Sequence, residues 1–191
     1  LEICEQAARS FEDLGCTVED TDPPWSDPRL CWISTFLGGA ATRLGPMLAD
    51  QRDEIDPGLA ALLDEVADWS PTRFVEAYFE RLTFVNEALA WFADYDLLLC
   101  PTMPVAAFEV GKNEPEVING TEMPRYGWEA FVYPFNMTGQ PAASVPCGFT
   151  NDGLPVGLQI VGRRFAEDTV LRAAARFEEA RPWADQRPPM S

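Results

Sequence analysis

Residues 133–162 read YPFNMTGQPAASVPCGFTNDGLPVGLQIVG, and they carry the strongest indication of the fold. Two mostly apolar runs in this segment, 142–147 and 156–161, are typical of strands. The turn-forming residues Asn-Asp-Gly at 151–153 lie between them. The segment therefore predicts two strands around a turn.

Four glycines and one glutamine in this segment have specific structural requirements. Gly139, Gly148 and Gly153 permit turns with positive φ, and Gly157 permits close approach of backbone to a strand. Gln159 lies between apolar neighbours of one strand, so its amide is expected to find hydrogen-bond partners in the interior.

The rest of the chain alternates helices with short strands. Ser70 and Pro71 begin a helix whose apolar stripe continues for about twenty residues. Further helices are expected over 1–14, 30–49, 58–67 and 166–180, strands over 16–19 and 95–100, and a small hairpin at Asn119-Gly120. This order predicts an α/β layered architecture in which other strands complete the sheet. Residues 181–191 are expected to form a loosely ordered tail.

Composition restricts the classes of function. The chain has 191 residues, of which 47% are hydrophobic, and a formal net charge of −17. A field of that sign repels phosphates, so nucleic acid is not expected as a partner. No apolar run reaches the roughly 20 residues that cross a bilayer, so no membrane association is expected and the protein is read as cytoplasmic. The five cysteines are odd in number and widely spaced, which favours reduced structural thiols.

The residues that the chain lacks limit its chemistry. It has no histidine, which excludes Ser-His-Asp catalysis and histidine-containing zinc sites within these residues. Its single lysine, Lys112, lies in a polar stretch, and there is no G-x-S-x-G motif or adjacent serine pair. The remaining routes to catalysis within the chain are paired carboxylates or a carboxylate-bound metal, but the acidic cluster Asp50, Asp53, Glu54 and Asp56 is more typical of a solvated charged face. No metal site and no cofactor are therefore expected.

The segment 133–162 resembles the C-terminal hallmark of the amidase-signature family. Residues 95–102, YDLLLCPT, resemble a buried strand of that family, and residues 1–20 resemble the helix and strand that follow its catalytic region. The resemblance implies that 1–191 is the C-terminal portion of a single amidase domain, with part of a mixed β-sheet flanked by helices. It also implies an acyl-enzyme mechanism with a nucleophilic serine, a second serine and a lysine, all N-terminal to this region.

The same resemblance implies where substrate would lie. Trp128, Glu129, Phe131, Val132 and Asn136 would face the substrate channel, and the aromatic residues favour a small neutral, apolar or aryl carboxamide. Each residue could instead belong to an ordinary core cluster, and Asn136 could hold a turn by bonding its own backbone. The stretch GLAALLDEVADWS at 58–70 lacks the arginines of the tRNA-dependent amidotransferase branch, which argues against that branch.

Two hypotheses follow. The first is an amide hydrolase portion that acts with the N-terminal catalytic portion of the same protein and is inactive alone. The alternative is a non-catalytic binding or interaction module with an amidase-like half-fold. A homodimer is left open.

Overall fold

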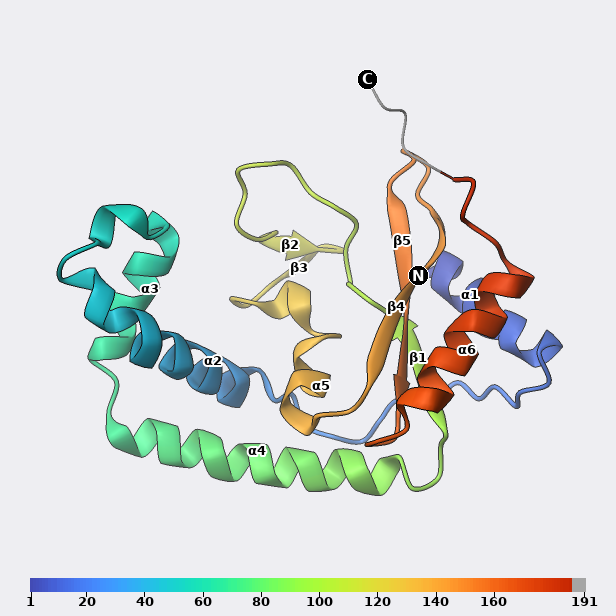
Figure 1. Ribbon diagram of the computed structural model, residues 1–191, viewed down its shortest axis with the longest axis horizontal. Coiled ribbons are helices and arrows are strands. Elements are labelled where there is room, and N and C mark those ends of the chain that lie inside the picture. The colour runs from blue at the N-terminus through green and yellow to red at the C-terminus, as the bar shows by residue number, and fades with distance from the viewer. Residues whose placement is uncertain (187–191) are drawn as a thin grey trace. The chain divides into compact units, whose positions relative to one another are not determined.

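The computed structural model describes residues 1–186, which form two compact units (Figure 1). Unit 1 combines residues 1–24 with the chain from residue 88 onward, and unit 2 is Trp25–Glu87. Each unit is described by itself below. That residues 1–191 form the C-terminal portion of one amidase domain stays a prediction.

A three-stranded antiparallel sheet forms the centre of unit 1. The strands are β1 (Leu97–Pro101), β4 (Ala142–Phe149) and β5 (Pro155–Gly162), in the order β1-β5-β4. They confirm the strands predicted at 95–100, 142–147 and 156–161, and with the flanking helices they confirm an α/β fold. Because β5 is central, β1 and β4 each have one side without a strand partner among residues 1–186.

Two helices cover one face of this sheet (Figure 1). They are α1 (Glu2–Asp13) and α6 (Glu167–Ala180), and both were predicted from apolar periodicity. Leu158 and Ile160 of β5 are fully buried beneath them, and the rings of Phe11 and Phe177 stack with centroids 5.5 Å apart. Each such buried side chain contributes about 1.5–3 kcal/mol, so this cluster is the main core of unit 1.

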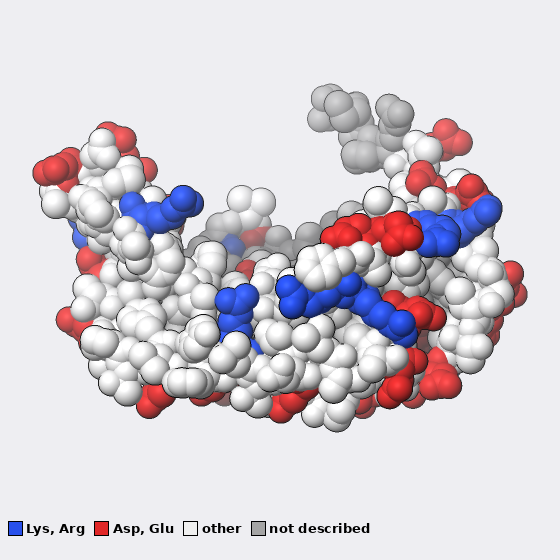
Figure 2. All heavy atoms as spheres, turned by 60° about the horizontal axis from the view of Figure 1, so that its bottom comes forward, with Lys and Arg blue, Asp and Glu red and all other residues white. Residues whose placement is uncertain are grey.

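The outer surfaces of the two helices carry ion pairs between neighbouring turns. Arg9 pairs with Glu12 at 3.0 Å and Arg172 with Asp168 at 3.0 Å. These side chains are exposed, so solvent screens both pairs and they add little to stability. Figure 2 shows acidic and basic side chains lying beside one another on the viewed face, between large uncharged areas. With 31 acidic and 14 basic residues, most carboxylates remain uncompensated.

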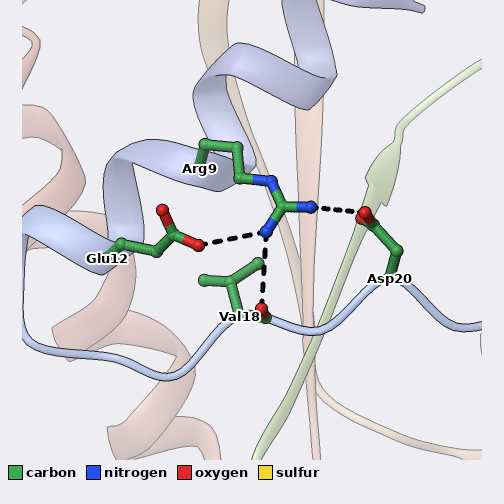
Figure 3. Close-up of polar contacts among 4 residues, drawn as sticks. All are labelled: Arg9, Glu12, Val18 and Asp20. Carbon is green, nitrogen blue, oxygen red and sulfur yellow. Dashed lines mark hydrogen bonds and ion pairs between the residues drawn. The ribbon is translucent and has the colours of Figure 1, made fainter.

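The strand predicted at 16–19 is wrong, because that segment pairs with no strand and runs as an irregular connection. A strand needs a neighbour to take its carbonyl and amide groups. Here the guanidinium of Arg9 in α1 donates a hydrogen bond to the Val18 carbonyl and also pairs with Glu12 and Asp20 (Figure 3). At Val18, a side chain of the preceding helix therefore supplies the hydrogen bond that a neighbouring strand would supply.

The end of α4 (Pro71–Trp91) is held by an arginine that follows β5. The Nε of Arg163 donates to the carbonyls of Phe92 at 2.8 Å and Tyr95 at 2.9 Å, and Nη2 donates to that of Ala93 at 3.3 Å. These carbonyls belong to the segment that follows α4, so Arg163 fixes that segment from a distant part of the chain.

Unit 2 is helical. It contains α2 (Arg29–Leu44), the 3-10 turns η1 (Gly45–Leu48) and η2 (Arg52–Glu54), α3 (Pro57–Ala67), and α4 as far as Glu87. The helix expected over 30–49 thus ends earlier, at Leu44. Gly38 lies within α2, and a Cβ there would be 2.5 Å from the ring of Phe74 in α4. Because glycine has no side chain, α2 and α4 can approach at this point.

Two smaller predictions concern the hairpin and the tail. The predicted hairpin is confirmed: β2 (Val117–Ile118) and β3 (Thr121–Glu122) turn at Asn119 and Gly120, whose positive φ values of 51° and 79° are those that a type I′ turn requires. In the expected tail, Trp183 lies against Phe177 with ring centroids 6.2 Å apart. Residues 187–191 lie outside the described residues, so the looseness of the tail stays a prediction.

Candidate functional site

The predicted substrate-binding residues lie on one short segment of unit 1. It contains the 3-10 turn η3 (Gly127–Glu129) and helix α5 (Tyr133–Thr138). Tyr126 precedes η3 in a left-handed conformation, with φ 62°, and its amide donates to Glu114 Oε2 at 2.8 Å. Gly139, with φ 70°, ends α5, as the prediction of a positive φ at this glycine requires.

Gln159 connects this segment to the sheet. Its Nε2 donates to the Phe131 carbonyl at 2.6 Å and to the Cys100 sulfur at 3.3 Å. Gln159 is only 5% exposed, and in β5 it lies on the face opposite Leu158 and Ile160. The prediction that it finds interior partners is confirmed. Since a buried donor left without an acceptor costs about 1–3 kcal/mol, this contact fixes the backbone at Phe131.

The five residues differ in their surroundings. Trp128 is half-buried and meets the ring of Phe108 edge-to-face, with centroids 5.4 Å apart. Phe131 and Val132 are half-buried between η3 and α5, whereas Asn136 is exposed on α5. Three apolar side chains therefore stay partly accessible in a segment whose backbone is fixed.

Glu129 is a half-buried carboxyl beside those apolar groups. Burial raises the pKa of Glu129, and the nearby Glu114 charge raises it further. Both causes disfavour the charged form. The segment thus carries an acid that resists ionisation, which fits a surface for neutral groups better than one for anions.

A pair of hydroxyls lies on the same sheet face as Gln159. Thr102 Oγ1 and Ser144 Oγ are 2.6 Å apart, and a Cβ added to Gly157 would lie 2.8 Å and 2.7 Å from them. The predicted need for close approach at Gly157 is confirmed, but hydroxyl side chains approach it and not another backbone. Ser144 is exposed and its hydroxyl bonds to another hydroxyl, which is no base.

A cavity of about 540 Å³ lies between the end of α5, the start of β4 and the start of α6. Asn136 lines it, and the other four predicted residues do not. The lining is Phe135, Asn136, Gly139, Gln140, Pro141, Ala142, Ala143, Glu167, Val170 and Leu171.

Sequence reasoning missed Gln140 and Glu167 in this lining. Gln140 is buried because its Oε1 accepts from Thr138 Oγ1 at 2.8 Å and its Nε2 donates to the Gly162 carbonyl at 3.2 Å. Glu167 begins α6, where its charge favours the helix N-terminus. Neither role leaves a spacing pattern in the sequence that would place these residues side by side.

Among side-chain nitrogen bases, the sequence offers one lysine and no histidine. The single lysine, Lys112, is exposed and pairs with Glu109 at 2.9 Å. Across residues 1–186, histidine, cysteine, aspartate and glutamate form no group of three or more that could hold a metal ion. Over the same range, every helix is too short or too polar to cross a membrane.

Comparisons with known proteins give consistent matches. The family model described as Amidase matches residues 50–171. An acylamidase of Rhodococcus erythropolis is 34% identical over 192 residues, which cover 98% of this chain and 40% of that protein. The structure of a bacterial aryl acylamidase of the amidase signature family superposes with a TM-score of 0.82 at 32% identity, covering 98% of this chain and 42% of that one.

A third relative is a different kind of enzyme component. It is a glutamyl-tRNA(Gln) amidotransferase component from Streptococcus equi subsp. zooepidemicus, and it is 38% identical over 207 residues, which cover 95% of this chain and 41% of that protein. The chain thus spans about two fifths of the length of the relatives it matches.

Proposed function

Because this chain belongs to the amidase family, we propose that it is the C-terminal portion of an enzyme that hydrolyses the C–N bond of a small neutral or apolar carboxamide. The observation that carries this proposal is the similarity to an acylamidase along 98% of the chain. The aryl acylamidase structure, similar over the same share of the chain, supports the preference for apolar acyl or aryl groups.

The proposed division of labour follows from the residues present. Amide hydrolysis needs a nucleophile, a base and donors for the oxyanion. The sequence has no histidine, and its one lysine is paired at the surface. The nucleophilic serine, its second serine and the lysine would come from the N-terminal catalytic portion of the same protein, and this chain alone is inactive.

This chain would contribute one wall of the substrate channel. Trp128, Phe131 and Val132 offer partly accessible apolar surface, and the hydrogen bond from Gln159 fixes the backbone of that segment. A buried methylene contributes about 0.8 kcal/mol, so each added acyl CH₂ that contacts this wall raises kcat/KM about fourfold. The half-buried surroundings that raise the pKa of Glu129 disfavour charge, so they would also disfavour anionic acyl groups, and Asn136 would complete the polar edge.

The experiment compares anilide hydrolysis by the 191-residue chain, by the N-terminal portion encoded upstream, and by the two together. Turnover is expected only with both portions present, and for acyl groups from acetyl to hexanoyl kcat/KM should rise with length. Phe131→Ala should flatten that rise, with the variant Val110→Ala, at a fully exposed side chain, as its control. Turnover by the 191-residue chain alone contradicts the proposed division of labour.

Part of a tRNA-dependent amidotransferase is the second candidate, favoured by the 38% identity to the streptococcal protein. Residues 58–70 contain no arginine that could hold a substrate carboxylate. We therefore expect faster turnover of neutral anilides than of glutamine, and the reverse order would favour this candidate. No turnover of either substrate by the combined portions would favour a non-catalytic interaction module. Light scattering of the same preparations tests the homodimer that the sequence leaves open.

A further inference from the structure

Two buried cysteines from distant parts of the chain meet on the covered face of the sheet. Cys4 lies in the first turn of α1, and Cys147 lies in β4, 143 positions later in the chain. Their sulfur atoms are 3.9 Å apart, and the two residues are 5% and 4% exposed. Both belong to the main core of unit 1.

Two features of β4 bring these cysteines together. Alternation along the strand directs Val145 and Cys147 toward the covered face, where both are buried. The next residue, Gly148, lies at an irregularity of the strand, and a Cβ there would be 2.7 Å from Ile3 Cγ2. Because Gly148 has no side chain, the first turn of α1 approaches β4 closely enough for Cys4 to contact Cys147.

We propose that Cys4 and Cys147 form a redox site, which a peroxide or a small disulfide oxidises to an intramolecular disulfide that ties α1 to β4. With hydrogen peroxide, the Cys4 thiolate attacks one oxygen, the O–O bond breaks, and hydroxide leaves. The sulfur of Cys147 then attacks the sulfur of the Cys4 sulfenic acid and displaces water. The Cys147 thiol proton leaves with the displaced water, and the hydroxide takes up the proton that Cys4 released on ionising. Two electrons thus pass from the two sulfurs to the peroxide, which becomes two water molecules.

The surroundings of the cysteines favour this pair. The hydrogen bond with Cys147 lowers the pKa of the Cys4 thiol to about 7, and the first turn of a helix also favours a thiolate. Burial raises the pKa of Cys31 and of Cys100 to about 11. Cys16 is exposed in the connection that follows α1. Cys4 is therefore the attacking thiol and Cys147 the resolving one.

The geometry requires little rearrangement. Disulfide sulfurs lie about 2.05 Å apart, so the two atoms must approach by roughly 2 Å, which small rotations of both side chains supply. Local opening of α1 admits a small oxidant to the buried sulfur atoms. The bond would close a loop through most of the chain, which restricts the unfolded state and stabilises the folded one.

The test oxidises the reduced, folded protein with hydrogen peroxide, blocks remaining thiols with iodoacetamide, and maps the unreduced digest by mass spectrometry. We expect one linked pair of peptides, containing Cys4 and Cys147 and lighter than their sum by two hydrogen atoms. The Tm of the oxidised protein should exceed that of the reduced protein by roughly 5 °C or more. Cys147→Ser should abolish both effects, whereas the surface control Cys16→Ser should preserve them.

Far-UV circular dichroism establishes that each variant is folded, and Cys4→Ala provides a second route if Cys147→Ser is not. Recovery of Cys4 and Cys147 as alkylated thiols, at an oxidant dose that fully modifies Cys16, overturns the proposal. A linkage of either residue to Cys31 or Cys100, or one that forms only in urea, also overturns it.

Discussion

Gly157→Ala tests the close contact on the sheet face that carries Gln159. The new Cβ would lie 2.7 Å from Ser144 Oγ and 2.8 Å from Thr102 Oγ1, so both hydroxyls must move and their 2.6 Å hydrogen bond is lost. Overpacking of this kind costs about 1–3 kcal/mol, and the lost hydrogen bond about 1 kcal/mol. Alanine returns about 0.5–1 kcal/mol because it restricts the unfolded chain more than glycine does. The net expectation is a loss of about 2 kcal/mol.

Urea unfolding, monitored by the fluorescence of the six tryptophans in this chain, measures this loss in the purified protein. With a slope near 2 kcal/mol per molar urea, the midpoint should fall by about 1 M. Gly39→Ala is the matched control, because no atom lies within 4 Å of its added Cβ in α2, and it should be neutral or stabilising.

A double-mutant cycle locates the cause. In a Ser144→Ala background one of the two contacts is gone, so the cost of Gly157→Ala should fall by about 1 kcal/mol. An unchanged cost in that background, or a Gly157→Ala variant as stable as the wild type, would show that the two hydroxyls do not limit the space at this position.

Three further predictions address other contacts. Gln159→Leu leaves the Phe131 carbonyl without its 2.6 Å donor and should destabilise the protein by about 1–3 kcal/mol in urea titrations, with the exposed Gln186→Leu as control. Because burial raises the folded-state pKa of Glu129, the wild type loses stability as pH rises through that pKa. Glu129→Gln should therefore have the higher Tm at neutral pH, and the difference in Tm should close under acidic conditions. An equal difference at every pH contradicts this. Arg163→Ala removes a donor from three carbonyls in the segment that follows α4 and should speed hydrogen exchange at residues 89–95, whereas Arg164→Ala should not.

The candidate site was predictable only in part. The resemblance placed Trp128, Glu129, Phe131 and Val132 on one segment, and the structure has the first two in η3 and the other two between η3 and α5. Asn136 instead lies at the cavity that Gln140 and Glu167 also line. Those two residues come from separate elements, and only the packing of α6 beside α5 and β4 brings them together. Whether the five residues contact substrate stays a prediction.

Elements with local signals could be located from the amino-acid order alone. Apolar runs and turn residues located β4, β5 and the Asn119-Gly120 turn, and Ser70 with Pro71 located the start of α4. These signals act over a few residues, because side-chain period and turn chemistry depend on neighbours in the chain.

Contacts between distant residues became visible only in the folded chain. The segment 16–19 has the composition of a strand but lacks a partner, and Arg9 takes the Val18 carbonyl. Gln159 meets a carbonyl 28 positions away, and Cys4 meets a thiol 143 positions away. Hydrogen bonds and packing depend on which surfaces meet in space, and one stretch of sequence does not contain that information.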